Sequence, residues 1–343
     1  MTNNRGYLAL LGICAAILAL IAFYYARAVL APVVFALFTI ALVWPLQSHL
    51  QARIPKLVAA LITIALVIVV VTTLATLVGW GFGRAARWLL ADLTRFQAMY
   101  QQAATWLEEH GFVITGVFGE VFNGSWVVAM LQRVGSRLQG ILSFAIVTLI
   151  YVLLGLLEVD TIAAKLRSLH NQEIGGSLIA AAGQAAAKLQ KYMLVRSVMS
   201  VITGALVYGF ALLIGLPLAA EWGVIAFALN YIPFLGSFIA TIAPTLFAFV
   251  QFESWEMALI VFVSLNVIQF VVGSYLEPRI AGSALSLSPF LVLFAIFLWS
   301  FLWGISGAFI GVPIVIVILA VCAQYPASRW VSELLAGTER KTT

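Results

Sequence analysis

The feature that most constrains this chain is an uncharged segment: residues 280–328 contain no Asp, Glu, Lys or Arg. Residues 57–83 and 222–252 are two further segments of this kind. A helix needs about 20 consecutive apolar residues to cross the hydrocarbon core of a bilayer, which is about 30 Å thick. Each segment exceeds that length, so the sequence predicts an all-α, polytopic membrane protein.

The composition agrees with this prediction. Of the 343 residues, 64% are hydrophobic and 9% are charged, against about a quarter charged in ordinary soluble domains. The net charge of +5 is spread over loops without a run of basic residues, so we interpret it as a topology signal and expect no nucleic-acid partner. Cys14 and Cys322 lie in apolar runs, where a disulfide or a metal site is not expected.

The charged residues that separate the apolar runs predict about eight transmembrane helices. The first apolar run is followed almost at once by a second, so we interpret it as an uncleaved span and not as a secretory signal. Residues 284–303 are predicted to form an extra hairpin that enters the membrane without crossing it. The expected spans are 7–26, 28–47, 57–82, 138–157, 197–219, 223–252, 257–276 and 304–325.

Two segments are not membrane-like. Residues 84–137 carry an amphipathic helical stripe, which predicts a helical hairpin outside the membrane, packed either on neighbouring helices or on another subunit. Residues 158–196 form a basic helical segment that the positive-inside rule places in the cytoplasm. Alternation then puts 84–137 in the periplasm and both termini in the cytoplasm. The predicted organisation is helices 1–3 in 1–83, the outer segment 84–137, helix 4 in 138–157, the basic segment 158–196, a transmembrane core in 197–328 and a tail in 329–343.

Prolines and polar residues cluster in the apolar runs of the C-terminal half. Because proline lacks a backbone donor and clashes with the preceding turn, we expect broken or re-entrant helices there. Backbone groups freed in a membrane are tolerated where they are buried in protein or line a wet cavity, as in many transporters. The alternative is a kink that only shapes the bundle. The expected breaks are Pro217, Pro233, Pro244, Pro278 and Pro289, and the candidate solute-path residues around the second of these are Asn230, Tyr231, Pro233, Phe234 and Ser237.

A second polar cluster adds three solute-path candidates, Asn266, Gln269 and Ser274. Asn266 and Gln269 fall on one face of a helix because steps of three and four return to the same side. Hydroxyl and amide groups of this kind are suited to hydrogen-bond a small polar solute.

Glu277 and Arg279 lie at the end of the same span, on either side of Pro278. They either neutralise each other or extend to the membrane interface, and the alternative is that Glu277 is a proton- or cation-linked carboxylate. No Asp or Glu lies in the middle of an expected span. A cation/proton antiporter normally needs such a group, so we favour a neutral polar solute.

Six motifs then occur in an order that resembles the autoinducer-2 exporter family of bacterial permeases. The resemblance covers nearly the whole chain, and it implies an inner-membrane permease. Members are proposed to export autoinducer-2, a small polar signal, or to exchange sodium or lithium for protons, and the resemblance also implies a homo-oligomer, with a pentamer expected. The motifs are Gly215-Leu216-Pro217, Asn230-Tyr231-Ile232-Pro233, Leu276-Glu277-Pro278-Arg279, Leu287-Ser288-Pro289, Trp303-Gly304-Ile305 and Val312-Pro313.

The sequence therefore predicts a permease for a small polar solute, with sodium(lithium)/proton antiport or a membrane scaffold without a solute path as alternatives. The chain has no phosphate loop and no His-Glu-x-x-His motif, so ATP-driven pumping of the phosphate-loop type is excluded and neither an enzyme nor a cofactor or metal is expected. The expected partners are membrane lipid, the solute and further copies of the chain.

Overall fold

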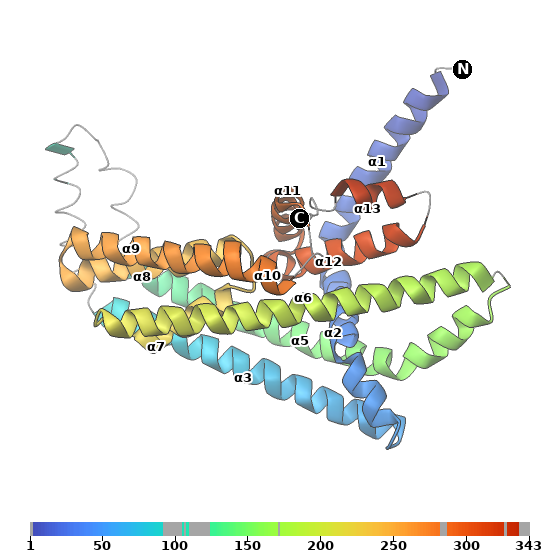
Figure 1. The fold of residues 1–343 in the computed structure, drawn as a ribbon, viewed down its shortest axis with the longest axis horizontal. Coiled ribbons are helices and arrows are strands. Elements are labelled where there is room, and N and C mark those ends of the chain that lie inside the picture. Colours follow the sequence, from blue (N-terminus) through green and yellow to red (C-terminus); the bar gives the residue numbers. More distant parts are fainter. Residues whose placement is uncertain are drawn as a thin grey trace. The chain divides into compact units, whose positions relative to one another are not determined.

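The computed structural model of the chain describes residues 3–91, 105, 108–109, 124–170, 172–281, 287–325 and 328–335. The regular elements in these ranges are helices (Figure 1). Seven of the helices described are long and apolar enough to cross a membrane, and three shorter apolar helices accompany them. The prediction of an all-helical polytopic membrane protein is confirmed.

Helices occupy the positions of the expected spans, and one of these spans is divided between two helices. The expected span 223–252 consists of two helices, α7 (Ala219–Leu229) and α8 (Leu235–Phe252). The expected hairpin 284–303 contains α11 (Pro289–Trp303), which is followed by α12 (Ile305–Gln324). Most of the predicted amphipathic segment 84–137 lies outside the described residues.

The basic segment 158–196 belongs to two long helices joined by a short turn. These are α5 (Gly124–Arg167) and α6 (Gln172–Leu213). At 1.5 Å per residue, the 42 residues of α6 extend about 63 Å, roughly twice the thickness of a hydrocarbon core. Helix α6 is therefore longer than a single crossing of the bilayer requires.

The chain divides into two compact units. Unit 1 comprises Met1–Val67, Ser143–Met193 and Gly282–Thr343. It contains α1 (Asn3–Tyr25), α2 (Arg27–Gln51), the first third of α3 (Lys56–Ala91), the second part of α5, the first half of α6, and α11 and α12. Ala36, Ala60 and Val152 are buried at the contact of α2, α3 and α5, and an ion pair of 2.8 Å joins Lys56 to Asp160.

A proline in α2 is compensated by a distant side chain. Pro45 lies inside this helix and has no N–H to donate to the carbonyl of Ala41, four residues earlier. Gln190 of α6 donates from Nε2 to that carbonyl at 2.6 Å. The carbonyl freed by the proline is thus satisfied inside unit 1, as buried backbone groups require.

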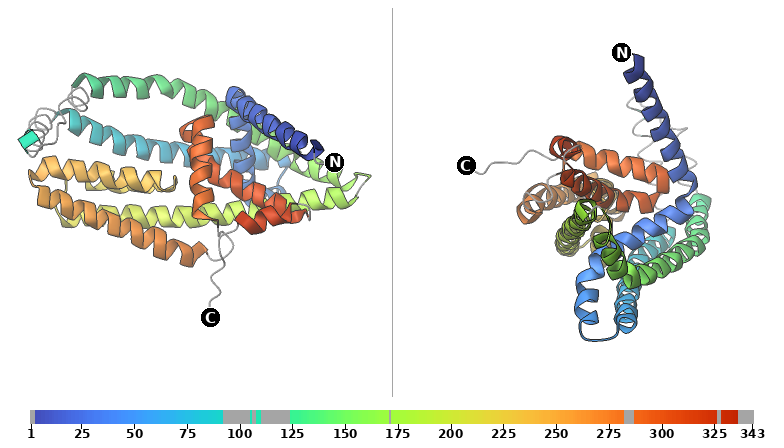
Figure 2. Two further views of the ribbon diagram at one scale, coloured as in Figure 1. Left: turned by 90° about the horizontal axis from the view of Figure 1, so that it is seen from above. Right: turned by 90° about the vertical axis from the view of Figure 1, so that its right-hand side faces the viewer.

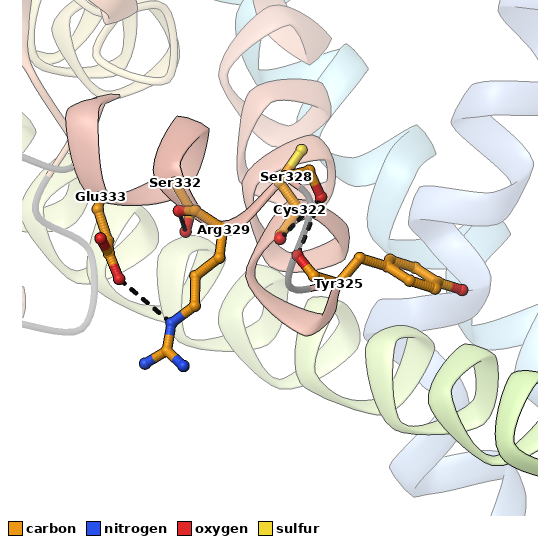
Figure 3. Close-up of polar contacts among 6 residues, drawn as sticks. All are labelled: Cys322, Tyr325, Ser328, Arg329, Ser332 and Glu333. Atoms are coloured by element: carbon orange, nitrogen blue, oxygen red, sulfur yellow. Dashed lines mark hydrogen bonds and ion pairs between the residues drawn. The ribbon is translucent and has the colours of Figure 1, made fainter.

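The C-terminal corner of unit 1 is held by local hydrogen bonds (Figure 3). Ser328 Oγ donates to the carbonyl oxygens of Cys322 and Tyr325, at 3.1 and 3.3 Å, and so joins the end of α12 to α13 (Arg329–Leu335). Arg329 forms an ion pair of 3.2 Å with Glu333 one turn later. The first part of the predicted tail 329–343 is therefore helical.

Unit 2 comprises Ile68–Leu142 and Leu194–Ala281. It contains the rest of α3, the first part of α5 and the second half of α6, then α7, α8, α9 (Trp255–Phe270), a π-helix (Val271–Leu276) and α10 (Glu277–Ala281). Figures 1 and 2 show α7, α8 and α9, in yellow to orange, lying side by side along the second half of α6. Their core includes Val207, Trp222, Phe247 and Leu265.

Candidate functional site

The candidate site lies in unit 2, where α6 and α7 form an antiparallel hairpin. The connecting turn contains Gly215, in the left-handed region at φ 68°, and Pro217. Gly204 of α6 and Gly223 of α7 face each other so closely that a Cβ on either residue would lie 2.8 or 2.9 Å from the other's carbonyl oxygen. This contact of small residues is typical of helices packed tightly within membranes.

α7 ends at Leu229, and the chain turns through Asn230–Phe234 before α8 begins at Leu235. Two residues of this turn contact α6. The amide Nδ2 of Asn230 donates to Ser200 Oγ at 3.2 Å, and the Tyr231 hydroxyl donates to Ser197 Oγ at 3.0 Å. Asn230 and Ser200 are buried, so the broken helix is fixed to α6 by polar contacts within an apolar core.

One turn along α6 from Ser200, the guanidinium of Arg196 donates to the carboxylate of Glu277 at 3.1 Å. Their side chains are 10% and 27% exposed, respectively. Each residue ends an uncharged stretch, 197–220 for Arg196 and 257–276 for Glu277. Arg196 therefore borders the first uncharged segment and Glu277 borders the second, and the ion pair joins these two boundaries.

The position of Glu277 follows from the backbone geometry of the helical turn before it. The N–H of Glu277 bonds to the carbonyl of Val272, five residues earlier, which makes residues 271–276 a π-helix. Short π-helical segments are frequently found at functional sites. The guanidinium of Arg279 lies 4.0 Å from the centre of the Tyr275 ring. Of the alternatives that the sequence left open for Glu277, the structure shows a pair with Arg196 in place of one with Arg279.

These contacts define what we call the α6 polar cluster. It joins one helix, one interhelical turn and the start of α10. Its members supply both hydrogen-bond donors and acceptors, and the Arg196 cation is paired with the Glu277 carboxylate. The members are Arg196, Ser197, Ser200, Thr203, Asn230, Tyr231 and Glu277.

The remaining sequence candidates lie apart from this cluster. Asn266 is exposed, and its side chain donates to the carbonyl of Phe262 in its own helix at 2.8 Å. Gln269 is half-buried, and Ser274 is exposed. Phe234 is 51% exposed. Ser237 is half-buried, and its carbonyl accepts from Thr241.

The prolines also divide into two groups. Pro217 and Pro233 lie in turns between helices, and Pro289 is the first residue of α11. Pro244 lies inside α8, and Pro278 lies within a helical stretch that continues from α9 through α10. The expected breaks at these last two positions are wrong, because neighbouring backbone groups adapt to a single proline without ending the helix.

Four members of the cluster are not among the sequence-predicted site residues: Arg196, Ser197, Ser200 and Thr203. We assigned Arg196 to the basic segment before the span. Residues 196, 200 and 203 follow steps of four and three, so they share one face of α6. The same rule that grouped Asn266 with Gln269 would have found them.

A second ion pair lies in unit 2, between α3 and α7. Arg84 Nε is 3.0 Å from Glu221 Oε1; the arginine side chain is 50% exposed and the glutamate is 4% exposed. Trp80 lies 5.6 Å from the Arg84 guanidinium. From Arg196 to Leu213 at the end of α6 the helix rises about 26 Å, so the two pairs lie toward opposite ends of the apolar part of α6.

The described part of the chain contains no group of three or more His, Cys, Asp or Glu side chains that could hold a metal ion. The chemistry available in the α6 polar cluster is hydrogen bonding and charge pairing. Such groups suit the recognition of a polar solute within an apolar surrounding.

Comparison with known proteins gives consistent results. The family model of the AI-2E family transporters matches residues 13–327. The AI-2 transport protein TqsA of Escherichia coli (strain K12) is 27% identical over 319 residues, which is 92% of each chain. A putative transport protein of Haemophilus influenzae is 24% identical over 99% of each chain. A putative transport protein of Borreliella burgdorferi is 28% identical over 66% of this chain and 63% of its own.

The family match extends from α1 to α12. It confirms the resemblance that the order of the motifs indicated, and it favours transport over a scaffold role. Relatives along the full length are described as transport proteins, and the helices of this chain suit that role. The chain therefore belongs to the AI-2E family of transporters and is a multi-pass membrane permease.

Proposed function

We propose that this permease moves a small polar solute across the bacterial inner membrane, along a path that passes the α6 polar cluster. The observation that carries the proposal is the pair of contacts from the α7–α8 turn to α6, Asn230 to Ser200 and Tyr231 to Ser197. Polar groups buried in a membrane protein are costly and are retained where they serve a solute path.

The first solute to test is autoinducer-2, since the relative TqsA is described as an AI-2 transport protein. Amide and hydroxyl groups of Asn230, Tyr231 and Ser200 are suited to bind its hydroxyls. We further propose cytoplasmic termini, from the distribution of basic residues, and no enzymatic activity of its own. A homo-oligomer, with a pentamer expected, also stays a prediction; the native mass of the purified protein tests it.

The experiment compares two identical substitutions at residues of the same type. Asn230→Leu removes the buried contact to Ser200, whereas Asn266→Leu removes only a bond to its own helix. In proteoliposomes that contain labelled autoinducer-2, we expect Asn230→Leu to lose most of its flux and Asn266→Leu to keep it. Ser200→Ala, which deletes only the acceptor, should lower flux without altering helix content or elution of the protein.

Equal flux in Asn230→Leu and Asn266→Leu would show that the α6 polar cluster is not part of the solute path. The same vesicles record sodium-driven pH change. A pH change without solute flux would favour antiport, and silence in both measurements would exclude autoinducer-2 as the solute under these conditions.

A further inference from the structure

The α6 polar cluster contains a buried cation that recognition of a neutral solute does not require. The side chain of Arg196 is only 10% exposed, and it directly precedes an uncharged stretch of α6. A charged side chain in such a place is costly, and it usually marks a binding or transport site. A structural ion pair alone would often be replaced by apolar residues at no cost in stability.

The face of α6 that carries Arg196 also carries hydroxyl groups. Ser200 and Thr203 follow on the same face of α6, at steps of four and three residues. Thr203 is fully buried, and its hydroxyl has no hydrogen-bond partner in the described part of the chain. Asn230 approaches Ser200 with its amide donor. A cation on a helix face that also offers hydroxyl donors suits a ligand group with several acceptor oxygens.

Glu277 supplies those oxygens in this structure. It is the more exposed member of the pair, 27% against 10%, and it begins the five-residue helix α10 immediately after a π-helix. The carboxylate side chain is therefore the more accessible of the two, and the side chain of Arg196 keeps a small exposed fraction. Another anionic oxygen group that reached Arg196 would meet the same donor.

We propose that Arg196 is a solute-selecting residue, which binds a carboxylate, phosphate or other anionic oxygen group of the solute in the place that the Glu277 carboxylate occupies here. This inference rests on the proposed solute path and names the class of solute that the path prefers. Glu277 is then an internal competitor, which neutralises Arg196 when no solute is bound.

A binding experiment tests the inference without transport. Glu277→Gln keeps the volume of the side chain and removes its charge, so inorganic phosphate should raise the melting temperature of the purified variant, because a ligand that binds the folded state stabilises it. Arg196→Gln in the same background should abolish the phosphate response, and Arg196→Lys should weaken it. Arg279→Gln is the matched control, since Arg279 lies over Tyr275, and it should leave the response intact.

A flux experiment gives the second readout. Phosphate should inhibit autoinducer-2 flux, and Glu277→Gln should lower the half-inhibiting concentration about tenfold, because loss of the internal competitor strengthens anion binding by about 1.4 kcal/mol. No phosphate response in Glu277→Gln, or a response that depends on Arg279, would overturn the inference whatever the flux. A phosphate response through Arg196 with no autoinducer-2 flux would support the inference and refute only that solute.

Discussion

Replacing Gly204 by alanine tests whether α6 and α7 must touch through their backbones. The new Cβ would lie 2.8 Å from the carbonyl oxygen of Gly223 and 2.9 Å from Phe227 Cβ, well inside ordinary contact. The helices would have to separate, and overpacking of this kind costs about 1–3 kcal/mol. Alanine returns up to about 1 kcal/mol through its higher helix propensity. We therefore expect a net destabilisation of about 1–2 kcal/mol.

Gly209→Ala is the matched control, because Gly209 lies on the same helix and no atom lies within 4 Å of the position that its new Cβ would take. Thermal unfolding of the purified variants should give a lower melting temperature for Gly204→Ala and an unchanged or higher one for Gly209→Ala. Separation of the helices would also lengthen the Asn230–Ser200 hydrogen bond of 3.2 Å, so Gly204→Ala should lose flux. Equal stability of the two variants would refute the close contact.

Two further predictions concern stability, and thermal unfolding measures both. Gln190→Leu should cost about 1–3 kcal/mol, since the Ala41 carbonyl loses its donor; adding Pro45→Ala should recover part of the loss, because residue 45 then donates to that carbonyl, and no recovery would contradict this account. Arg84→Leu should cost about 1–3 kcal/mol more than Glu221→Gln, because Arg84→Leu leaves a buried carboxylate without its partner, whereas Glu221→Gln leaves a cation that is already half-exposed. If Glu221→Gln cost more than Arg84→Leu, the assignment of Glu221 as the buried residue of the pair would be wrong.

The helices were predictable because uncharged runs and their charged boundaries are properties of the sequence. The turn at Asn230–Phe234 was predictable from Pro233, but the expected breaks at Pro244 and Pro278 were wrong. A proline shows where a donor is missing. It does not show whether neighbouring groups can absorb the defect, as they do in α8 and in the π-helix before Glu277.

The candidate site was less predictable because its contacts join distant parts of the chain. The only partner that the sequence suggested for Glu277 was Arg279, two residues away, whereas the structure pairs it with Arg196, 81 residues away. Asn230 and Tyr231 were identified from their position beside a proline, but their partners Ser200 and Ser197 were not. Polar residues beside a helix break can be recognised from the local sequence. Which helix face they contact depends on how the helices pack, and the local sequence does not show that.

The contact between Gln190 and the Ala41 carbonyl has a consequence for biogenesis. Residue 41 is synthesised 149 residues before its donor, so α2 emerges from the ribosome with a backbone carbonyl that its own helix cannot satisfy. Until α6 is made, that carbonyl needs water or the insertion machinery as its partner. The hydrogen bonding of α2 before Pro45 is therefore completed late, and a ribosome stalled before residue 190 would leave a nascent chain whose α2 is inserted but whose Ala41 carbonyl still lacks its donor.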